Sequence, residues 1–250
     1  MTRWFFLCCL IAFFHQTALP AQPVYLIHDD ADPMIALADG LNRKGIRSVL
    51  WTQEQAIESK DLDDSLAVVM YIHHELKSVT EQKLIHYAKS GGRLIVLHHG
   101  LASGKVQNPK WLDFLGVRLF PNSTSRFPWR VLRGKYQLIN LKPFHYVTSH
   151  DVVYPATVPY VPSDTPSVEQ NLPAIEFPQT EIFLNQVFAD AREKTVLFGF
   201  RTEIAGTIYM QDRGGWMMKA GKGWVFYFQP GHWPRDFENP AYIQILANAI

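Results

Sequence analysis

Short, nearly uninterrupted apolar runs separated by helical patterns constrain the fold of this chain most. Leu66–Ile72 (LAVVMYI) and Arg93–Leu97 (RLIVL) have the composition of strands that are buried on both faces of a sheet. The segment between them carries apolar residues at helical spacing and ends at Gly91-Gly92, as a helix does. Strands that alternate with helices predict an α/β domain with a mostly parallel central sheet and helices on both faces.

The same alternation starts near the N terminus. Val24–His28 (VYLIH) has the pattern of a strand, apolar residues then recur at helical spacing up to Gly45, and Ile46–Trp51 (IRSVLW) resumes as a strand. Ser78 and Glu81 have the spacing of a capping box at the start of the helix between the two buried strands. The first half of the chain therefore predicts a three-layer arrangement around a parallel sheet.

The second half of the chain has a different composition. Residues 120–179 are rich in proline, serine, asparagine and aromatics, which predicts a loop-rich insertion with brief strands on the main sheet. Later apolar runs predict an additional antiparallel strand region with a hairpin at Gly221–Gly223. These runs are Glu181–Phe188, Thr195–Phe200, Trp216–Ala220 and Gly223–Phe228. Asn108-Pro109 and Asn239-Pro240 begin short helices. We expect one domain over residues 22–250.

Residues 1–21 have the features of a secretory signal peptide. Arg3 precedes an apolar run from Trp4 to Phe14, and small residues follow, with cleavage expected after Ala21. The run has eleven residues, fewer than the roughly 20 that a membrane-spanning helix needs. An N-terminal membrane anchor is the alternative. The leader predicts a secreted or periplasmic protein with no stable membrane anchor after cleavage.

Charge and cysteine content exclude several classes of function. Lysine and arginine number 24 against 23 acidic residues, so no global field attracts nucleic acid or an anionic membrane. We expect a small-molecule partner. Both cysteines, Cys8 and Cys9, lie in the leader, so the mature chain has no thiol for catalysis.

Histidines gather where the predicted strands end. Ligands of open α/β sheets bind at the carboxyl ends of the strands. The strand-end histidines are His28, His73, His74, His98, His99 and His232. Hydrogen bonds to loop backbone are the alternative role for His28, His73 and His74. His98 and His232 lie at sharp strand exits beside Gly100 and Gly231, which favours a functional pocket.

Three segments carry a resemblance to a known family. They are GGRLIVLHHG (91–100), NLPAIEFPQTEIFLNQ (171–186) and the C-terminal region with FYFQPGHWPRDF (226–237). The chain resembles the ThuA-like, or trehalose-utilisation, family, whose fold is similar to that of class I glutamine amidotransferases. The resemblance implies a flavodoxin-like fold and a sugar or polyol substrate. The family commonly has Asp-Glu before an aromatic where this chain has Thr180-Glu181, so only Glu181 carries over.

The similarity to amidotransferases also shows what is missing. Relative to Gly100, His98 stands where those enzymes have a nucleophilic cysteine, and His232, with Pro234 after it, resembles their triad histidine. An imidazole can act as acid, base or ligand, but it does not replace a glutaminase thiol. We therefore expect no amidotransferase activity.

Our leading hypothesis from the sequence is an exported protein that uses histidine acid/base chemistry on a carbohydrate. His98 is the expected general acid/base, His232 its partner, and Glu181 the group that orients an imidazole or a sugar hydroxyl. His28, His73, His99 and Trp233 are the expected substrate-binding residues.

Two alternatives stay open. In the first, His98, His232 and Glu181 are the ligands of a divalent metal such as zinc, which would indicate a metal-dependent hydrolase, although no cofactor is certain from the sequence. The second alternative is a non-catalytic sugar-binding module.

Other residues near the expected site have open roles. Trp129 and Phe127 would suit sugar stacking, whereas Trp216 is expected in the core. A basic stretch (Arg126, Arg130, Arg133 and Lys135) is interpreted as solvated surface, with an anionic substrate group as the alternative.

Overall fold

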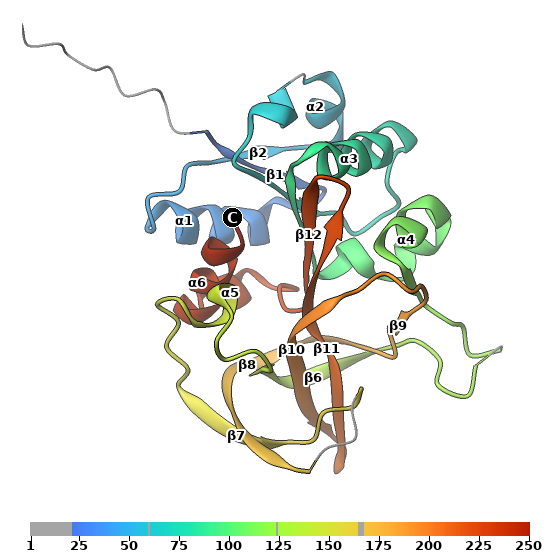
Figure 1. The fold of residues 1–250 in the computed structure, drawn as a ribbon, viewed down its shortest axis with the longest axis vertical. Helices are drawn as coiled ribbons and strands as arrows, with labels where there is room; N and C mark the ends of the chain where they lie inside the picture. Colours follow the sequence, from blue (N-terminus) through green and yellow to red (C-terminus); the bar gives the residue numbers. More distant parts are fainter. Residues whose placement is uncertain (1–21, 60, 124, 165–167) are drawn as a thin grey trace, which may run out of the picture.

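The computed structural model describes residues 22–59, 61–123, 125–164 and 168–250, so the expected signal peptide lies outside the described residues. Ten strands form one sheet in the order β2-β1-β3-β4-β12-β11-β10-β6-β8-β7 (Figure 1). They are β1 (Val24–His28), β2 (Ser48–Trp51), β3 (Ala67–Tyr71), β4 (Arg93–Leu97), β6 (Arg130–Asn140), β7 (Ala156–Tyr160), β8 (Gln170–Leu184), β10 (Thr195–Ile204), β11 (Thr207–Ala220) and β12 (Gly223–Phe228). Two short strands, β5 (Val117–Arg118) and β9 (Val187–Phe188), pair separately.

The parallel half of the sheet contains β2, β1, β3, β4 and β12. Alternate residues of its strands enter two different cores: Leu26 lies in one, whereas Tyr25 and Ile27 lie in the other. The first core packs α1 (Ala31–Asn42) and α6 (Pro240–Ala249), and the second packs α2 (Gln53–Glu58), α3 (Ser78–Ser90) and α4 (Pro109–Leu115). In Figure 1, α1 and α6 lie to the left of β12, whereas α3 and α4 lie to its right. The expected mixed α/β fold is confirmed.

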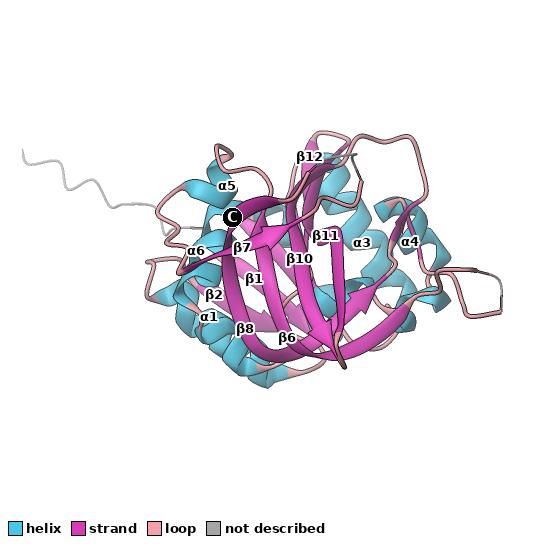
Figure 2. Ribbon diagram, turned by 90° about the horizontal axis from the view of Figure 1, so that it is seen from below, coloured by secondary structure: helices cyan, strands magenta, loops and turns pink. Residues whose placement is uncertain are grey.

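The antiparallel half continues the same sheet from β12 through β11, β10, β6 and β8 to β7 (Figure 2). It is therefore as large as the parallel half, not a small addition to it. The segment 120–179, expected to hold brief strands, contains the 11-residue β6, β7 and much of the 15-residue β8. The first six residues of β6 are exposed or half-buried and only its last five are buried. The apolar part of β6 is therefore too short for the sequence to predict the full length of the strand.

Local signals set several helix ends. Gly91 ends α3 with φ 136°, and the Asn239 side chain accepts hydrogen bonds from the first backbone N–H groups of α6, as the sequence indicates. The expected capping box at Ser78 is wrong. Ser78 is already the first residue of α3, Lys77 takes the cap position, and the Glu81 side chain is buried. Short 3-10 helices add four turns: η1 (Asp61–Asp64), η2 (His98–Leu101), η3 (Ser103–Gln107) and η4 (Pro234–Glu238).

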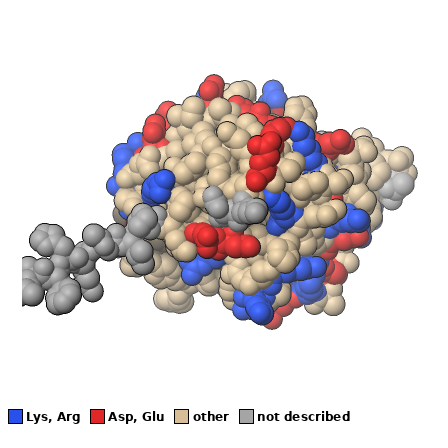
Figure 3. All heavy atoms as spheres, turned by 90° about the horizontal axis from the view of Figure 1, so that it is seen from above, with Lys and Arg blue, Asp and Glu red and all other residues tan. Residues whose placement is uncertain are grey.

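No helix in the described ranges is long and apolar enough to cross a bilayer. On the face shown in Figure 3, acidic and basic side chains are interspersed among uncharged ones. This mixed surface agrees with the nearly balanced charge of the sequence.

Candidate functional site

His98 lies at the point where the buried strand β4 turns sharply into η2. Its backbone has φ 42°, a left-handed conformation that residues with a Cβ rarely adopt, and its side chain is fully buried. The Trp111 indole N–H, 2.8 Å from the carbonyl oxygen of Gly100, fixes the following turn. An unfavourable backbone around a buried imidazole is the kind of feature that accompanies functional sites.

The neighbouring glycine has a packing role. A Cβ at Gly100 would lie 2.5 Å from a methyl carbon of Val96 and 2.9 Å from the sulfur of Met70. Gly100 therefore lets η2 pack closely against β3 and β4. From the sequence alone, this glycine is interpreted as a residue that allows a ligand to approach closely.

His232 reaches the same edge of the sheet from the adjacent parallel strand. Because Phe228 of β12 pairs with Leu97 of β4, the segments that follow the two strands leave side by side. The Nε2 atom of His98 lies 3.2 Å from Nδ1 of His232. The two imidazoles are thus within hydrogen-bonding distance.

Glu181, on β8 of the antiparallel half, places one carboxylate oxygen among three histidines. Its Oε2 atom is 3.3 Å from Nε2 of His99, 3.4 Å from Nδ1 of His232 and 3.7 Å from Nε2 of His98. The other oxygen, Oε1, accepts hydrogen bonds from the Arg133 guanidinium at 2.7 and 3.1 Å. Arg133 and Glu181 are direct partners in the β6–β8 ladder, so the register of these strands sets this contact.

Hydrogen bonding determines which nitrogen of His98 carries the proton. Its Nδ1 atom lies 2.6 Å from the backbone carbonyl oxygen of Gln229. A carbonyl oxygen only accepts, so Nδ1 is the protonated nitrogen and the Nε2 lone pair faces His232 and Glu181. His99 has a buried Nδ1 without a partner among the described residues. Donation from its Nε2–H to Glu181 leaves that buried nitrogen as an acceptor, which is less costly than a buried unpaired N–H.

The environment keeps His99 and His232 neutral and the Glu181 carboxylate charged. Burial, followed by the proximity of His98, lowers the pKa of His99 to about 3 and that of His232 to about 4. Burial alone would raise the pKa of Glu181, but hydrogen bonds from Nε2–H of His99 and from the Arg133 guanidinium hold it below its ordinary value. Imidazoles of such low pKa accept protons weakly near pH 7, but they retain a lone pair for a metal ion.

The spacing of the ligand atoms matches a metal site. One atom each from His98, His99, Glu181 and His232 lies within 4.8 Å of all the others. Zinc–nitrogen bonds of about 2.0–2.1 Å imply ligand atoms about 3.3 Å apart in a tetrahedral site. His98, His232 and Glu181 form a triangle with sides of 3.2, 3.4 and 3.7 Å. The three residues expected from the sequence to act together are thus brought together at this spacing.

Comparison with known proteins identifies the family. The family model ThuA, described as trehalose utilisation, matches residues 23–250. The chain belongs to the ThuA family. No curated protein sequence matches it.

Solved structures show the same fold at low sequence identity. A protein described as ThuA-like, from Bacteroides uniformis, is 12% identical, with a TM-score of 0.59 over 94% of this chain and 93% of its own. A β-galactosidase from Bacillus circulans sp. alkalophilus is 10% identical, with a TM-score of 0.51, and the match covers 92% of this chain but 31% of the enzyme. At these identities the likeness shows the fold alone.

The expected substrate-binding residues of this ThuA-family chain lie in different places. His99 is part of the cluster, and the ring of His73 packs on it with centroids 4.0 Å apart. Trp233 lines a neighbouring cavity, and its ring packs against the His232 ring with centroids 4.3 Å apart. His28 lies apart: it lines a separate cavity of 270 Å³, and within the described ranges no hydrogen bond, ion pair or ring contact joins it to the cluster.

Two charged residues that the sequence analysis did not single out hold the loop after β3. Asp29 accepts hydrogen bonds from the backbone N–H groups of His73 and His74 and from Nδ1 of His73 at 3.1 Å. The buried Lys105 ammonium donates to the carbonyl oxygens of Ile72, at 2.7 Å, and of both histidines. Asp29 directly follows β1, so the rule about strand ends could have indicated it.

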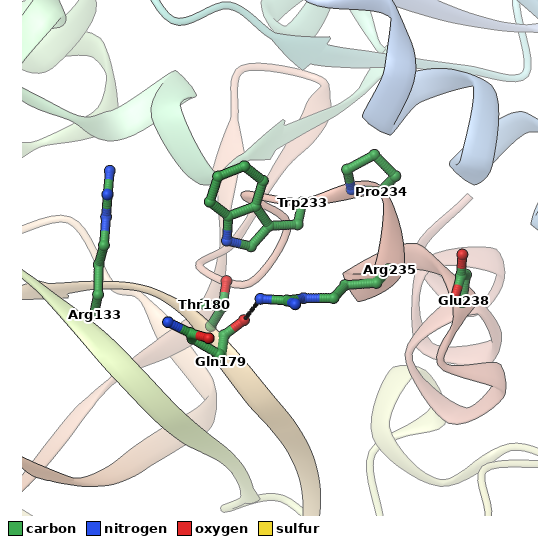
Figure 4. Close-up of a pocket in the computed structure, with 7 residues that line it drawn as sticks. All are labelled: Arg133, Gln179, Thr180, Trp233, Pro234, Arg235 and Glu238. Carbon is green, nitrogen blue, oxygen red and sulfur yellow. Dashed lines mark hydrogen bonds between the residues drawn. The ribbon is translucent and has the colours of Figure 1, made fainter.

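A cavity of 470 Å³ opens beside the cluster (Figure 4). It is lined by Arg133, Gln179, Thr180, Trp233, Pro234, Arg235 and Glu238. Arg133 also binds Glu181, and Trp233 directly follows His232. The cavity therefore adjoins two members of the cluster. The aromatic residues considered for sugar stacking lie in different environments. Trp233 lines this cavity, whereas Trp216 is fully buried in the core, as expected.

Proposed function

We propose that this ThuA-family protein is a metal-dependent enzyme that acts on a carbohydrate, with His98, His232 and Glu181 as the ligands of a divalent metal such as zinc. One observation carries the proposal: three ligand atoms from three separate segments of the chain lie 3.2–3.7 Å from one another. That spacing is close to the roughly 3.3 Å between neighbouring ligands of tetrahedral zinc.

Outer contacts support the same ligand set. The Gln229 carbonyl oxygen holds His98 with Nε2 directed at the cluster, while Arg133 and His99 hold the two oxygens of Glu181. Metal-binding histidines almost always donate their second ring N–H to such a partner, and bound carboxylates are also hydrogen-bonded. His99 then acts as a positioning residue for Glu181.

Two histidines and one glutamate leave a coordination position open. A metal held there would supply a polarised water or bind a substrate oxygen. The low pKa of His99 and His232 makes these two histidines weak proton acceptors near neutral pH when no metal is bound. Metal-dependent hydrolysis, an alternative at the level of the sequence, therefore becomes the leading reaction class.

Two observations favour a carbohydrate as the substrate. The family is described by trehalose utilisation, and the half-exposed Trp233 presents an aromatic surface in the cavity beside His232. The apolar C–H face of a sugar ring can pack on such a surface while its hydroxyl groups bind polar residues.

Metal binding is the direct test. Protein stripped with a chelator is titrated with zinc by calorimetry, alongside His98→Asn, His232→Gln and Glu181→Gln. Asparagine is chosen at position 98 because it tolerates the left-handed backbone. We expect about one zinc ion per wild-type chain and a loss of affinity of at least about 100-fold in each variant. His86→Asn, an exposed histidine of α3, is the matched control and should bind as the wild type does.

Turnover is measured with the same proteins. A panel of sugars, including trehalose, is incubated with zinc-loaded protein and followed by mass spectrometry. Activity that disappears with the chelator and returns with zinc supports the proposal. Equal zinc binding by wild type and Glu181→Gln would contradict it. Zinc and sugar binding without any product would instead assign the chain a binding role.

We also propose that the protein is exported after removal of residues 1–21. The support is the order of Arg3, the apolar run from Trp4 to Phe14 and the small residues that end at Ala21. Cell fractionation and N-terminal sequencing test it. Export of a chain that begins near Gln22 is expected, and Leu10→Asp, which interrupts the apolar run, should leave the uncleaved protein in the cytoplasm.

A further inference from the structure

The cavity beside the cluster has an aromatic side and a cationic side. In Figure 4 the Arg235 side chain crosses the cavity below the Trp233 indole and reaches Gln179. We propose that the cavity binds a sugar ring that carries a carboxylate or phosphate, with the ring stacked on Trp233 and the anionic group against Arg235. The inference rests on the proposed function, which places the reacting end of the same substrate at His98, His232 and Glu181.

Trp233 is held in place as a binding surface. Its backbone N–H donates to the Asp236 carboxylate at 3.2 Å, and the hydroxyl of Thr180 donates to the same oxygen at 2.7 Å. Asp236 is 2% exposed, so this contact is fixed inside the protein, whereas the Trp233 side chain remains 40% exposed. The edge contact with His232 further restricts the ring. A large aromatic ring that is restrained but exposed loses little entropy when it binds a ligand.

Arg235 retains an unbalanced charge. Its guanidinium has five N–H donors, and in the described ranges its one hydrogen bond goes to the Gln179 carbonyl oxygen at 2.7 Å. No carboxylate among the described residues forms an ion pair with it, whereas Arg133 is neutralised by Glu181. Glu238 also lines the cavity but does not pair with Arg235. The remaining donors suit a planar carboxylate or a phosphate.

Trp233 lies close to both a candidate metal ligand and Arg235. Trp233 contacts His232 with ring centroids 4.3 Å apart, and the guanidinium carbon of Arg235 lies 5.9 Å from the Trp233 ring centre. A sugar ring over the indole would therefore lie near both the candidate metal ligand His232 and the Arg235 guanidinium. The anionic group at Arg235 would be a different part of the substrate from the one at the candidate metal ligands.

Calorimetry with zinc-loaded protein tests the inference against glucose, glucuronate, glucose 6-phosphate and inorganic phosphate. We expect glucuronate or glucose 6-phosphate to bind roughly tenfold or more tightly than glucose, as a charge-assisted contact implies. Arg235→Met should remove this preference and leave glucose binding unchanged. Trp233→Ala should weaken all three sugars, and Trp233→Phe should retain most of the affinity. The better of the two acids shows which anionic group is recognised.

Lys219→Met is the control, because Lys219 lies over the Trp224 ring at 4.7 Å in the β11–β12 hairpin, outside the cavity. It should not change any affinity. Equal binding of glucose and the acidic sugars by the wild type would overturn the inference. So would tight binding of inorganic phosphate that Trp233→Ala does not affect, because that result describes an anion site without a sugar.

A second set of titrations separates this inference from the proposed function. Chelator-treated wild type should still prefer the acidic sugars, because Arg235 and Trp233 do not depend on a metal. If zinc fails to bind but the preference is present, only the metal proposal fails. If zinc binds with the expected ligand dependence and the preference is absent, only the inference about the acidic sugar fails.

Discussion

The Nδ1 atom of His98 lies 2.6 Å from the carbonyl oxygen of Gln229, and this contact joins the ends of β4 and β12. The Gln229 side chain is also engaged: it accepts from the backbone N–H of Phe183 at 3.0 Å and donates to the Phe183 carbonyl oxygen at 3.2 Å. Phe183 lies two residues after Glu181 on β8. One buried glutamine therefore positions His98 and the strand that carries Glu181.

Replacement of Gln229 should weaken metal binding without removing a ligand. Gln229→Leu breaks both contacts with Phe183, so β8 and the residue 229 carbonyl lose their fixed positions. We expect zinc affinity to fall by about 10–100-fold, as for other outer contacts of metal ligands. Gln186→Leu is the control, because Gln186 is also buried and donates to Tyr227. It should lower the unfolding temperature and leave zinc affinity unchanged, and an equal loss of affinity in both variants would contradict the role of Gln229.

The left-handed backbone of His98 should be measurable as strain. His98→Gly and His98→Ala remove the same hydrogen bonds, but only glycine adopts φ 42° without penalty. We expect the glycine variant to have the higher free energy of unfolding, by about 1 kcal/mol. In α3 the order should reverse, with His86→Gly less stable than His86→Ala by about 1 kcal/mol. Urea unfolding of the four variants gives both differences, and the same order at both positions would exclude strain at His98.

The meeting of His98 and His232 could be predicted from the sequence because it depends on local patterns. Apolar runs mark the parallel strands, and the carboxyl ends of parallel strands share one edge of the sheet. The metal site expected from the sequence also contains Glu181, but this residue is chosen because of the family resemblance. Its spacing in the sequence gives no such indication, since Glu181 is far from both histidines along the chain and lies on an antiparallel strand.

The arginine partner of Glu181 could not be predicted in the same way. Arg133 belongs to a basic stretch with the composition of solvated surface, and its side chain is in fact 63% exposed. Its contact with Glu181 depends on the register between β6 and β8, which shifts at an irregularity between Gly134 and Tyr136. Sequence patterning does not fix the register of a strand whose first half is largely exposed. His28 shows the converse: it is expected at the site because it lies at a strand end, but this position does not bring it into the cluster.

Lys105 should make stability depend on pH in alkaline solution. Burial lowers its pKa to about 8, whereas an unfolded lysine titrates near about 10.4. Between these pH values the unfolded chain binds more protons than the folded chain, so the contribution of Lys105 to stability rises with pH, by at most about 1.4 kcal/mol per pH unit. The difference in unfolding free energy between wild type and Lys105→Met should therefore increase from pH 8 to pH 10. Urea unfolding at each pH measures it, and a constant difference would show that Lys105 titrates normally.

Asp29 should contribute stability that acid removes. Its carboxylate accepts two backbone N–H groups, from His73 and His74, as well as Nδ1 of His73. These hydrogen bonds outweigh the effect of burial and hold its pKa below the ordinary value. Asp29→Asn turns an amide group toward those donors, so we expect a loss of about 1–3 kcal/mol at pH 7.

The sign of the pH dependence follows from the lowered pKa. The contribution of Asp29 is present at pH values above the ordinary carboxyl pKa of about 3.9, and it is lost as the pH falls from there through the lower pKa of the folded protein. The stability difference between wild type and Asp29→Asn should therefore be constant from pH 7 to pH 5 and shrink below about pH 4. Asp30→Asn is the matched control, because Asp30 precedes α1 without a side-chain capping hydrogen bond, and it should change stability little at any pH. If Asp29→Asn behaves like Asp30→Asn, the three hydrogen bonds do not hold the loop that orients His73.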